Sequence, residues 1–190
     1  MSPQMTVADF EARYARDPDP WDYRTSTYER DKYAQTLLAC GPGPLGRALE
    51  LGASIGVFSL VLAPRCAEVV TVDAAPTAVA AARRHHAGLP HVDARVGVLP
   101  GDLPTGPFDL VIASEILYYL SRPDLDETLE GLRGALRPGG RLVAVHWRPR
   151  TPERALDADD VHGALAALPW LTRELCVEHP QYLLERYAAR

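Results

Sequence analysis

The stretch "ELGASIG" at residues 50–56 matches two different loop templates. Gly52 to Gly56 fits the G-x-S-x-G elbow that presents a serine nucleophile in hydrolases. It equally fits a glycine-type loop that lets a nucleoside cofactor lie against the backbone. Both loops join a strand to a helix, so the elements around residues 50–56 have to decide between them.

From residue 46 onward, short apolar runs alternate with helical patterns. Such an alternation predicts a parallel sheet covered by helices on both faces. The predicted strands are 46–51, 67–73, 91–98, 108–114 and 141–147, and the predicted helices are 56–64, 76–88 and 122–140, the last stopped by Pro138-Gly139-Gly140.

The C-terminal part departs from this alternation. A helical pattern at 159–168 precedes two strand-like runs, 171–179 and 181–189, which are separated only by Pro180. So short a connection permits an antiparallel pair but no parallel crossover. We therefore expect the open parallel sheet to end in an antiparallel hairpin.

The N-terminal part reads as two helices, at 6–17 and 26–39, with no strand before residue 46. The chain contains no internal repeat and no linker long enough to separate domains. We expect one domain over residues 1–190, in which residues 1–40 form a helical cap on a core at 46–190.

The composition indicates a soluble protein with a small partner. The chain of 190 residues is 47% hydrophobic, carries a formal net charge of -5 and has no Lys/Arg-rich run. Nucleic acids and anionic membranes both require a basic face, so neither is expected as a partner. The absence of a signal-like or membrane-spanning run predicts a cytoplasmic protein. Three isolated cysteines and no cluster with ligand spacing predict reduced thiols and no metal.

A serine elbow requires more than the loop itself. It needs an oxyanion-hole loop from an earlier strand, and here only polar, helical sequence precedes the first strand. An acid and a histidine do follow, with Asp109, Glu115, His146 and His162 as candidates. The serine hydrolase therefore stays an alternative.

The nucleotide-type loop makes a prediction that the sequence can check. A loop after the first strand lies at the topological switch point, where open α/β sheets bind ligands. An acidic residue should end the second strand, about 20 residues further on, to receive ribose hydroxyls. Asp73 stands there. Glu50, beside the loop, would repel a pyrophosphate but suits a cofactor with an ammonium group and a sulfonium, as in S-adenosylmethionine (SAM).

The ordered segments "ALELGASIGVFS", "VVTVDAAPTAV", "FDLVIASEILYYL" and "LRPGGRLVAVH" resemble the motifs of class I SAM-dependent methyltransferases. The N-terminal "DPWDYRTSTYERDKYAQTL" and "SEILYYL" are similar to the NodS-type enzymes, which N-methylate an aminosugar. The resemblance implies a Rossmann-like sheet of seven strands in the order 3-2-1-4-5-7-6, with the last strand antiparallel. It also implies SAM as cofactor, S-adenosylhomocysteine (SAH) as product, a small-molecule acceptor, and a monomer or homodimer.

The chain departs from the family pattern at two positions. Ser54 stands where the loop usually has its middle glycine, and its small side chain should still allow close approach of a cofactor. Val98 stands where the family usually has an acid that holds the adenine amino group. Asp102 or the backbone of Val98 and Leu99 are the alternatives for that contact.

Methyl transfer depends on positioning, and an amine acceptor must also lose a proton. Glu115, after the fourth strand, is the first candidate for the base, His146 is the second, and Tyr119 completes the predicted catalytic group. His85 and His86, beside two arginines at a helix end, are interpreted as surface residues. The predicted cofactor contacts are Trp21, Tyr28, Glu50, Gly52, Ala53, Ser54, Gly56, Asp73, Ala74, Val98, Leu99 and Ser114, and the predicted acceptor contacts are Tyr23, Lys32, Tyr118 and Trp147.

Three functional classes follow. A small-molecule methyltransferase leads, with nitrogen favoured over oxygen as the acceptor atom. A SAM-binding protein without catalysis and the serine hydrolase are the other two. A nucleic-acid base methyltransferase does not fit, because "SEIL" stands where such enzymes carry a [DN]-P-P-[YF] run.

Overall fold

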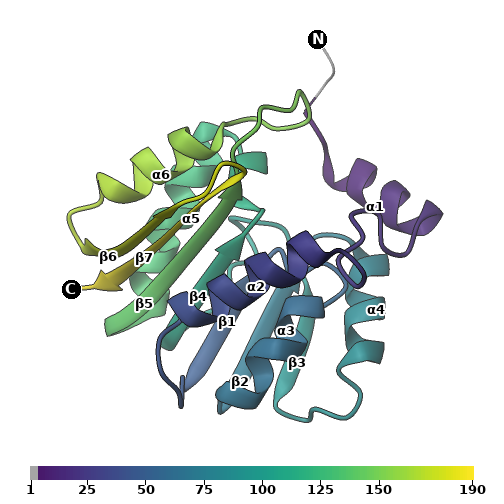
Figure 1. Cartoon of the computed structure of the whole chain (residues 1–190), viewed down its shortest axis with the longest axis horizontal. Helices are drawn as coiled ribbons and strands as arrows, with labels where there is room; N and C mark the ends of the chain where they lie inside the picture. Colours follow the sequence, from purple (N-terminus) through teal and green to yellow (C-terminus); the bar gives the residue numbers. More distant parts are fainter. Residues whose placement is uncertain (1–3) are drawn as a thin grey trace.

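The computed structural model describes residues 4–190 and shows a central sheet between two layers of helices (Figure 1). The first three residues of the expected cap lie outside the described residues. The elements are α1 (Val7–Arg16), α2 (Thr27–Ala39), β1 (Arg47–Leu51), α3 (Val57–Leu62), the 3-10 helix η1 (Ala63–Arg65), β2 (Glu68–Asp73), α4 (Pro76–His85), β3 (Val92–Val96), β4 (Phe108–Ser114), the 3-10 helix η2 (Leu117–Tyr119), α5 (Arg122–Ala135), β5 (Leu136–Trp147), α6 (Ala158–Ala166), β6 (Leu171–Glu178) and β7 (Tyr182–Ala189).

The sheet has seven strands in the order β3-β2-β1-β4-β5-β7-β6. Strand β1 pairs in parallel with β2 on one side and with β4 on the other, so Glu50 lies between Thr71 and Ile112. Strand β7 is antiparallel to both β5 and β6. The predicted fold class, strand order and C-terminal hairpin are confirmed.

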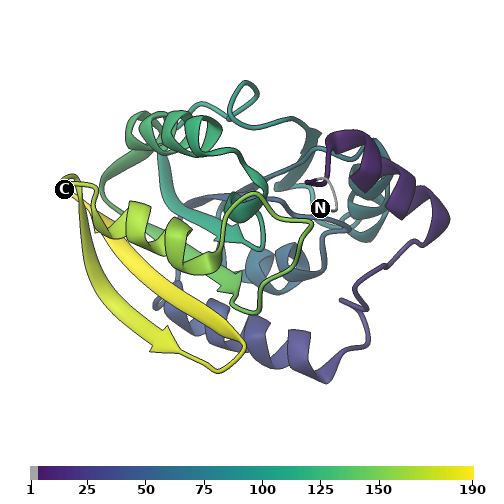
Figure 2. The ribbon, with the colours of Figure 1, turned by 90° about the horizontal axis from the view of Figure 1, so that it is seen from above.

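Alternating side chains of the central strands form a core on each face. Leu49 and Leu51 of β1 pack on the side of α5 and α6, whereas Ala48 packs on the side of α2 and α3. Figure 2 shows α2 and α5 on opposite sides of the sheet. Each fully buried leucine contributes about 1.5–3 kcal/mol relative to an exposed one, so the two apolar layers hold the strands in register.

One predicted boundary was wrong. Helix α5 ends at Ala135, and the chain already pairs with β4 at Leu136, before Pro138-Gly139-Gly140. The two glycines lie in an irregular part of β5, where the register moves from Phe108 paired with Leu136 to Leu110 paired with Arg141. This segment is therefore a bulge inside a strand and not the stop of a helix.

The carboxyl ends of β1 and β4 are neighbours, and the connections from these two strands run in opposite directions along the sheet. This edge is the topological switch point that the sequence predicts. Helix α1 contacts α4 beside it, and in Figure 1 it lies at the same end of the molecule as the loop after β5.

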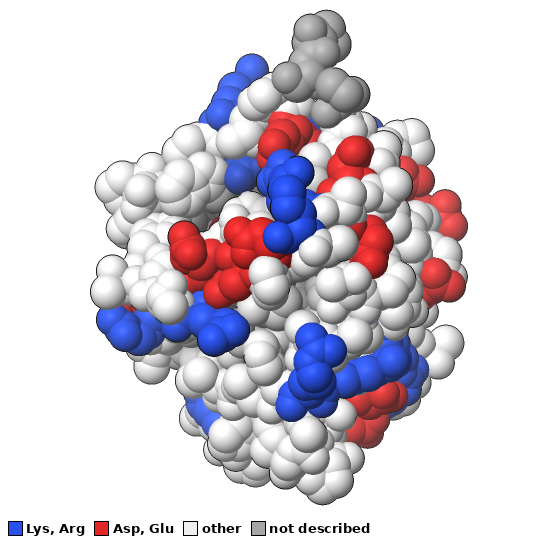
Figure 3. Space-filling view, turned by 90° about the vertical axis from the view of Figure 1, so that its right-hand side faces the viewer, with Lys and Arg blue, Asp and Glu red and all other residues white. Residues whose placement is uncertain are grey.

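Charges on the surface are mixed in sign. Figure 3 shows the face on the right-hand side of Figure 1, where Lys and Arg side chains lie in small groups between acidic and uncharged ones. Across residues 4–190, none of the helices combines the length and apolar character that crossing a bilayer requires.

Candidate active site

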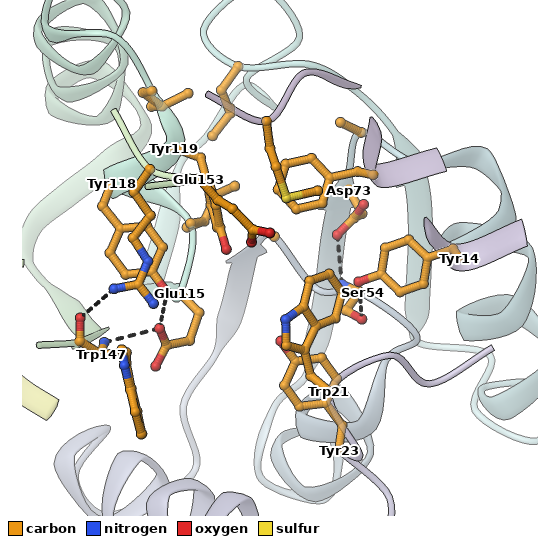
Figure 4. Close-up of a pocket in the computed structure, with 18 of the residues that line it drawn as sticks. Tyr14, Trp21, Tyr23, Ser54, Asp73, Glu115, Tyr118, Tyr119, Trp147 and Glu153 are labelled. Atoms are coloured by element: carbon orange, nitrogen blue, oxygen red, sulfur yellow. Dashed lines mark hydrogen bonds between the residues drawn. The ribbon is translucent and has the colours of Figure 1, made fainter. Parts of the chain in front are cut away.

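A cavity of about 470 Å³ lies at the carboxyl ends of β1 and β4 (Figure 4). Loops after β1 and β2 form one end of it, and residues after β4 and β5 form the other. Helix α1 and the loop at 148–157 supply further wall residues. The volume is within the range of about 300–1,000 Å³ that small-molecule sites have.

The loop after β1 has an alternating left-handed backbone. Gly52, Ser54 and Gly56 have φ angles of 70°, 52° and 79°. A Cβ atom on Gly52 would lie 2.8 Å from the side chain of Ile116, so this position requires glycine for space as well as for its conformation. Ser54 adopts the same left-handed region without being glycine, which makes it a strained residue at the wall of the cavity.

Asp73 ends β2 and organises this loop. Its Oδ2 accepts the backbone N–H of Ser54 at 2.8 Å, and its Oδ1 accepts that of Ala75 at 2.9 Å. Burial raises the pKa of Asp73, and the backbone N–H groups act against that rise. The carboxylate lines the cavity beside the loop, where the ribose of a nucleoside cofactor is expected.

The segment after β3 forms the next part of the wall, with Gly97, Val98 and Leu99. Asp102 does not line the cavity; its Oδ2 accepts the backbone N–H of Val98 at 2.9 Å. The alternative in which Asp102 replaces the missing acid therefore loses support, because its carboxylate orders the loop itself. The backbone of Val98 and Leu99 is left as the candidate adenine contact.

Glu115 follows β4 with a φ of 56°, so a second strained residue lies at the opposite end of the cavity. Its Oε1 is 2.8 Å from the Lys32 ammonium, which also contacts Glu29 at 2.9 Å. Its Oε2 accepts the backbone N–H of Trp147 at 3.0 Å and the hydroxyl of Tyr118. Lys32 is 3% exposed, and burial raises the pKa of the Glu29 carboxyl while Lys32 acts against that rise.

Aromatic rings surround the space between these two ends. Trp21 lies 5.5 Å from the Tyr14 ring and 5.9 Å from the Tyr23 ring, and the Tyr28 ring meets Trp147 edge-on at 5.4 Å. Figure 4 shows Trp21 and Tyr23 on the side of Ser54, and Tyr118 and Trp147 on the side of Glu115. All of these rings line the cavity.

The structure brings most of the predicted residues to one cavity. The predicted residues that line it are Trp21, Tyr23, Tyr28, Lys32, Gly52, Ser54, Asp73, Ala74, Val98, Leu99, Glu115, Tyr118, Tyr119 and Trp147. The segments that supply them are far apart in sequence, so their meeting at one place agrees with a shared binding site.

Glu50 does not line the cavity. It is 3% exposed, and its carboxyl accepts the hydroxyl of Ser59, in α3, at 2.5 Å. The reason is the period of the strand: Glu50 points to the α3 side of the sheet, whereas the loop leaves the strand two residues later. Burial raises the pKa of Glu50 to about 8. Its predicted direct role beside the cofactor is corrected accordingly.

His146 is also placed away from the cavity. It is fully buried, and its Nδ1 lies 3.1 Å from Nε2 of His162, whose own Nδ1 donates to Glu185 at 2.7 Å. Burial lowers the pKa of His146. In β5 it is the neighbouring Trp147 that lines the cavity, because successive side chains point to opposite faces. His146 is therefore not retained as a base.

Three other predicted contacts, Ala53, Gly56 and Ser114, do not line the cavity either. Ala53 is buried against the sheet by a hydrogen bond from its N–H to Val72, and Gly56 begins α3. His86 corrects another prediction: it is 4% exposed, and its Nε2 donates to the Gly56 carbonyl at 3.1 Å.

The hydrolase alternative lacks its base. The Ser54 hydroxyl is 2.5 Å from the Tyr14 hydroxyl. His162 and His146, the candidate histidines, bond to one another between α6 and β5. Among the described residues, Ser54 thus has no histidine hydrogen-bonded to its hydroxyl, which the nucleophile elbow requires.

Sequence reasoning expected the cap and the loop after the fifth strand to shape the pocket, but it did not name the wall residues of α1 and of the loop at 148–157, or several that lie beside the predicted contacts. Periodicity predicts α1 but not the element that it covers, and it gives no path for a loop. The lining residues that were not predicted are Met5, Val7, Phe10, Tyr14, Ser26, Glu29, Val72, Gly97, Ile116, Leu120, Thr151, Glu153 and Arg154.

Comparisons with known proteins agree with this geometry. The Methyltransferase domain family matches residues 49–142. A protein from Pseudomonas syringae whose crystal structure is described as that of a methyltransferase is 36% identical, with a TM-score of 0.74, over 86% of this chain and 99% of that one. The chain belongs to the class I methyltransferase family.

Within this family, the NodS proteins are similar over most of the chain. Nodulation protein S of Rhizobium tropici is 35% identical over 84% of this chain and 66% of its own length. The crystal structure of the N-methyltransferase NodS from Bradyrhizobium japonicum WM9, in complex with SAH, has a TM-score of 0.86 at 26% identity over 96% of this chain and 97% of that one. The chain spans 59% to 66% of the length of the three curated nodulation proteins that it matches.

Proposed function

We propose that residues 1–190 form one methyltransferase domain, which transfers a methyl group from SAM to the nitrogen of a small-molecule amine or aminosugar and releases SAH. The observation that carries the proposal is that one cavity has two chemically different ends. Asp73 and the left-handed loop lie at one end, and Glu115 lies among aromatic rings at the other. The similar NodS protein from Bradyrhizobium japonicum WM9 is an N-methyltransferase, which supports nitrogen as the acceptor atom.

The first end suits a nucleoside with an amino-acid tail. Gly52 leaves its backbone accessible where a side chain would be excluded, and Asp73 offers carboxylate lone pairs for ribose hydroxyls. We assign the adenine to the wall formed by Val98 and Leu99. Bound there, SAM supplies a methyl group on a positive sulfonium, and the electron pair of the broken C–S bond stays on sulfur. Aromatic faces such as that of Trp21 attract such a cation by about 0.5–2 kcal/mol.

The second end suits a cationic amine. Glu29 and Glu115 contact the ammonium of Lys32. The charged residues that line the whole cavity are four acidic ones (Glu29, Asp73, Glu115 and Glu153) and two basic ones (Lys32 and Arg154), so the wall carries a net negative charge when all are ionised. The rings of Tyr28 and Trp147 add apolar and cation-binding surface. We infer that an ammonium-bearing acceptor is drawn to this end, where it loses a proton before its nitrogen lone pair attacks.

Glu115 is the residue that we assign to the acceptor. Its carboxylate already accepts hydrogen bonds from three donors, including a charged one, so its oxygen lone pairs are largely occupied. This favours recognition of the ammonium by charge over abstraction of its proton, with water taking the proton. Exact positioning of the two reactants then supplies about 7–11 kcal/mol of the barrier.

Cofactor binding is tested by calorimetric titration of the protein with SAH and with SAM. Asp73→Asn should weaken SAH binding by about 10- to 100-fold, because a charged hydrogen-bond partner of the ribose is lost. Asp93→Asn is the matched control, since Asp93 is an exposed carboxylate on β3 that pairs with Arg95. Wild-type protein that gives no heat with either ligand would refute the proposal.

Acceptor chemistry is tested by mass spectrometry after incubation with SAM and either glucosamine or N-acetylglucosamine. Glucosamine should gain a methyl group on nitrogen, whereas acetylation removes the nucleophilic amine. Glu115→Gln should raise KM for glucosamine while kcat changes by less than tenfold, if Glu115 recognises charge. A fall in kcat of about 10²- to 10⁴-fold would instead assign it as the base, and equal methylation of both sugars would indicate an oxygen acceptor.

A further inference from the structure

The loop at residues 52–56 has a serine, Ser54, at a position where its backbone conformation favours glycine. Ser54 has a φ of 52° between Gly52 and Gly56, and the left-handed region costs a residue with a Cβ atom conformational energy that glycine avoids. A serine at this position therefore needs a compensating contact. That contact comes from the cap.

The compensating contact is a buried hydrogen bond between hydroxyl groups. The Tyr14 hydroxyl donates to Oγ of Ser54 at 2.5 Å, and the two residues are 4% and 8% exposed. The backbone N–H of Ser54 donates in turn to Asp73. A continuous chain of hydrogen bonds thus runs from α1 through Ser54 to the carboxylate that we assign to the ribose.

Tyr14 lines the cavity together with Val7 and Phe10 of α1, and its hydroxyl makes the hydrogen bond from this helix to the loop at residues 52–56. Figure 4 shows its hydroxyl directed at Ser54 beside Trp21 and Asp73. The other polar attachments of α1 lie elsewhere on the helix: Glu11 accepts the N–H of Thr77 at the start of α4, and Arg13 pairs with Glu153 at 2.8 Å. Removing the Tyr14 hydroxyl therefore breaks the hydrogen bond between α1 and the loop, while the apolar cluster of the Tyr14 ring with Ile55 and the other polar attachments stay in place.

We infer that Tyr14 is a positioning residue that acts through Ser54. The Tyr14–Ser54 hydrogen bond holds α1 over the cofactor end of the cavity and slows the release of cofactor. We call this hydrogen bond the latch. This inference rests on the proposed function for the identity of the cofactor. The latch itself is a property of the ligand-free protein.

The latch is tested with Tyr14→Phe, Ser54→Ala and the double variant. Ser54→Ala keeps a Cβ atom in the left-handed backbone, so it removes the hydroxyl without relieving the strain. Tyr187→Phe is the matched control: it also removes a buried tyrosine hydroxyl, one that donates to Glu185 away from the cavity. Hydrogen exchange of the α1 amides is measured without ligand, and the SAH dissociation rate is measured by stopped flow.

Either single variant should accelerate both α1 exchange and SAH dissociation about fivefold, equivalent to about 1 kcal/mol, while the association rate stays unchanged. In the double variant both rates should also rise about fivefold, because the two substitutions break the same hydrogen bond. Tyr187→Phe should change neither rate.

A variant with wild-type exchange and dissociation rates would overturn the inference. So would a double variant whose effect is the product of the single effects, about 25-fold, since the two side chains would then act independently. If wild-type protein binds no SAH, the proposed function fails, and exchange of the α1 amides still decides whether the latch exists. If Tyr14→Phe does not fold, Ser54→Ala against wild type gives the same decision.

Discussion

Glu50 gives the protein a stability that should fall as pH rises. Its carboxyl lies between β1 and α3, 3% exposed, and burial raises its pKa from 4.5 to about 8. The hydroxyl of Ser59 opposes this rise, and the charge of Asp73 adds to it. Because the folded-state pKa exceeds the unfolded one, the contribution is complete below pH 4.5 and is lost between pH 4.5 and about 8.

The size of the effect follows from the two pKa values. Each pH unit between them costs the folded state about 1.4 kcal/mol. From pH 5 to pH 8 the wild type should therefore lose about 3 kcal/mol relative to Glu50→Gln, which never ionises. Glutamine adds an amide that needs partners, but that cost does not depend on pH, so the change in the difference is the informative quantity.

The assay is urea unfolding of ligand-free wild type and Glu50→Gln at pH 5 and pH 8. Glu127→Gln, at an exposed position of α5, serves as the control and should show the same free-energy difference from wild type at both pH values. A difference between wild type and Glu50→Gln that stays constant within about 0.5 kcal/mol would refute the reasoning. It would mean that the buried carboxyl is solvated or paired in a way that the structure does not show.

Three further predictions concern Lys32, two glycines and two buried histidines. Lys32→Met should lower the free energy of unfolding in urea by about 3 kcal/mol, because the buried Glu29 and the partly buried Glu115 lose their counter-ion. Retention of wild-type stability would show that both carboxylates are solvated. Gly134→Ala should raise the free energy of unfolding by about 0.5–1 kcal/mol, since a Cβ atom at this helix position meets open space. Gly106→Ala should lower it by about 2 kcal/mol, since its Cβ atom would lie 2.0 Å from the backbone oxygen of Ala135. Urea unfolding that ranks the two variants in the opposite order would contradict this prediction. Burial lowers the pKa of His86 and of His146, so their contribution to stability should fall as pH decreases below about 6.5, by up to about 1.4 kcal/mol per pH unit for each and opposite in sign to the effect of Glu50. Urea unfolding of His146→Phe between pH 6.5 and pH 5 should therefore show less loss of stability on acidification than wild type, and an identical pH dependence would assign the acid sensitivity to other groups.

The sequence predicts the sheet well because its signals are local. The run at 108–114 is apolar enough to be a strand by itself, and β4 has the same bounds. The position of Asp73 follows from the length of one strand-loop-helix unit, so the first β-α-β unit could be placed without any tertiary contact. The strand order came from the family resemblance and agrees with the structure.

Two errors in the candidate site, at Glu50 and His146, have the same cause, which is the direction in which a side chain points near a strand end. Glu50 and His146 each stand close to the carboxyl edge of the sheet, where the sequence places the ligand. Each points instead into a helix-covered face, toward Ser59 and His162. If the register of a strand changes by one residue, its side chains move to the opposite face of the sheet. Sequence periodicity does not determine that register, so it cannot tell which residue at a strand end faces the ligand.

The cap was the least predictable part of the site, and the structure makes it part of the site itself. Two of the three described non-glycine residues with a positive φ, Ser54 and Glu115, follow neighbouring strands and lie at opposite ends of the cavity. Tyr14 of α1 contacts the first, and Lys32 of α2 contacts the second. Each contact holds a side chain that its own backbone disfavours, and strain of this kind persists only where surrounding structure imposes it. The N-terminal helices therefore do more than cover the sheet: they hold both ends of the cavity in the geometry that the proposed transfer requires.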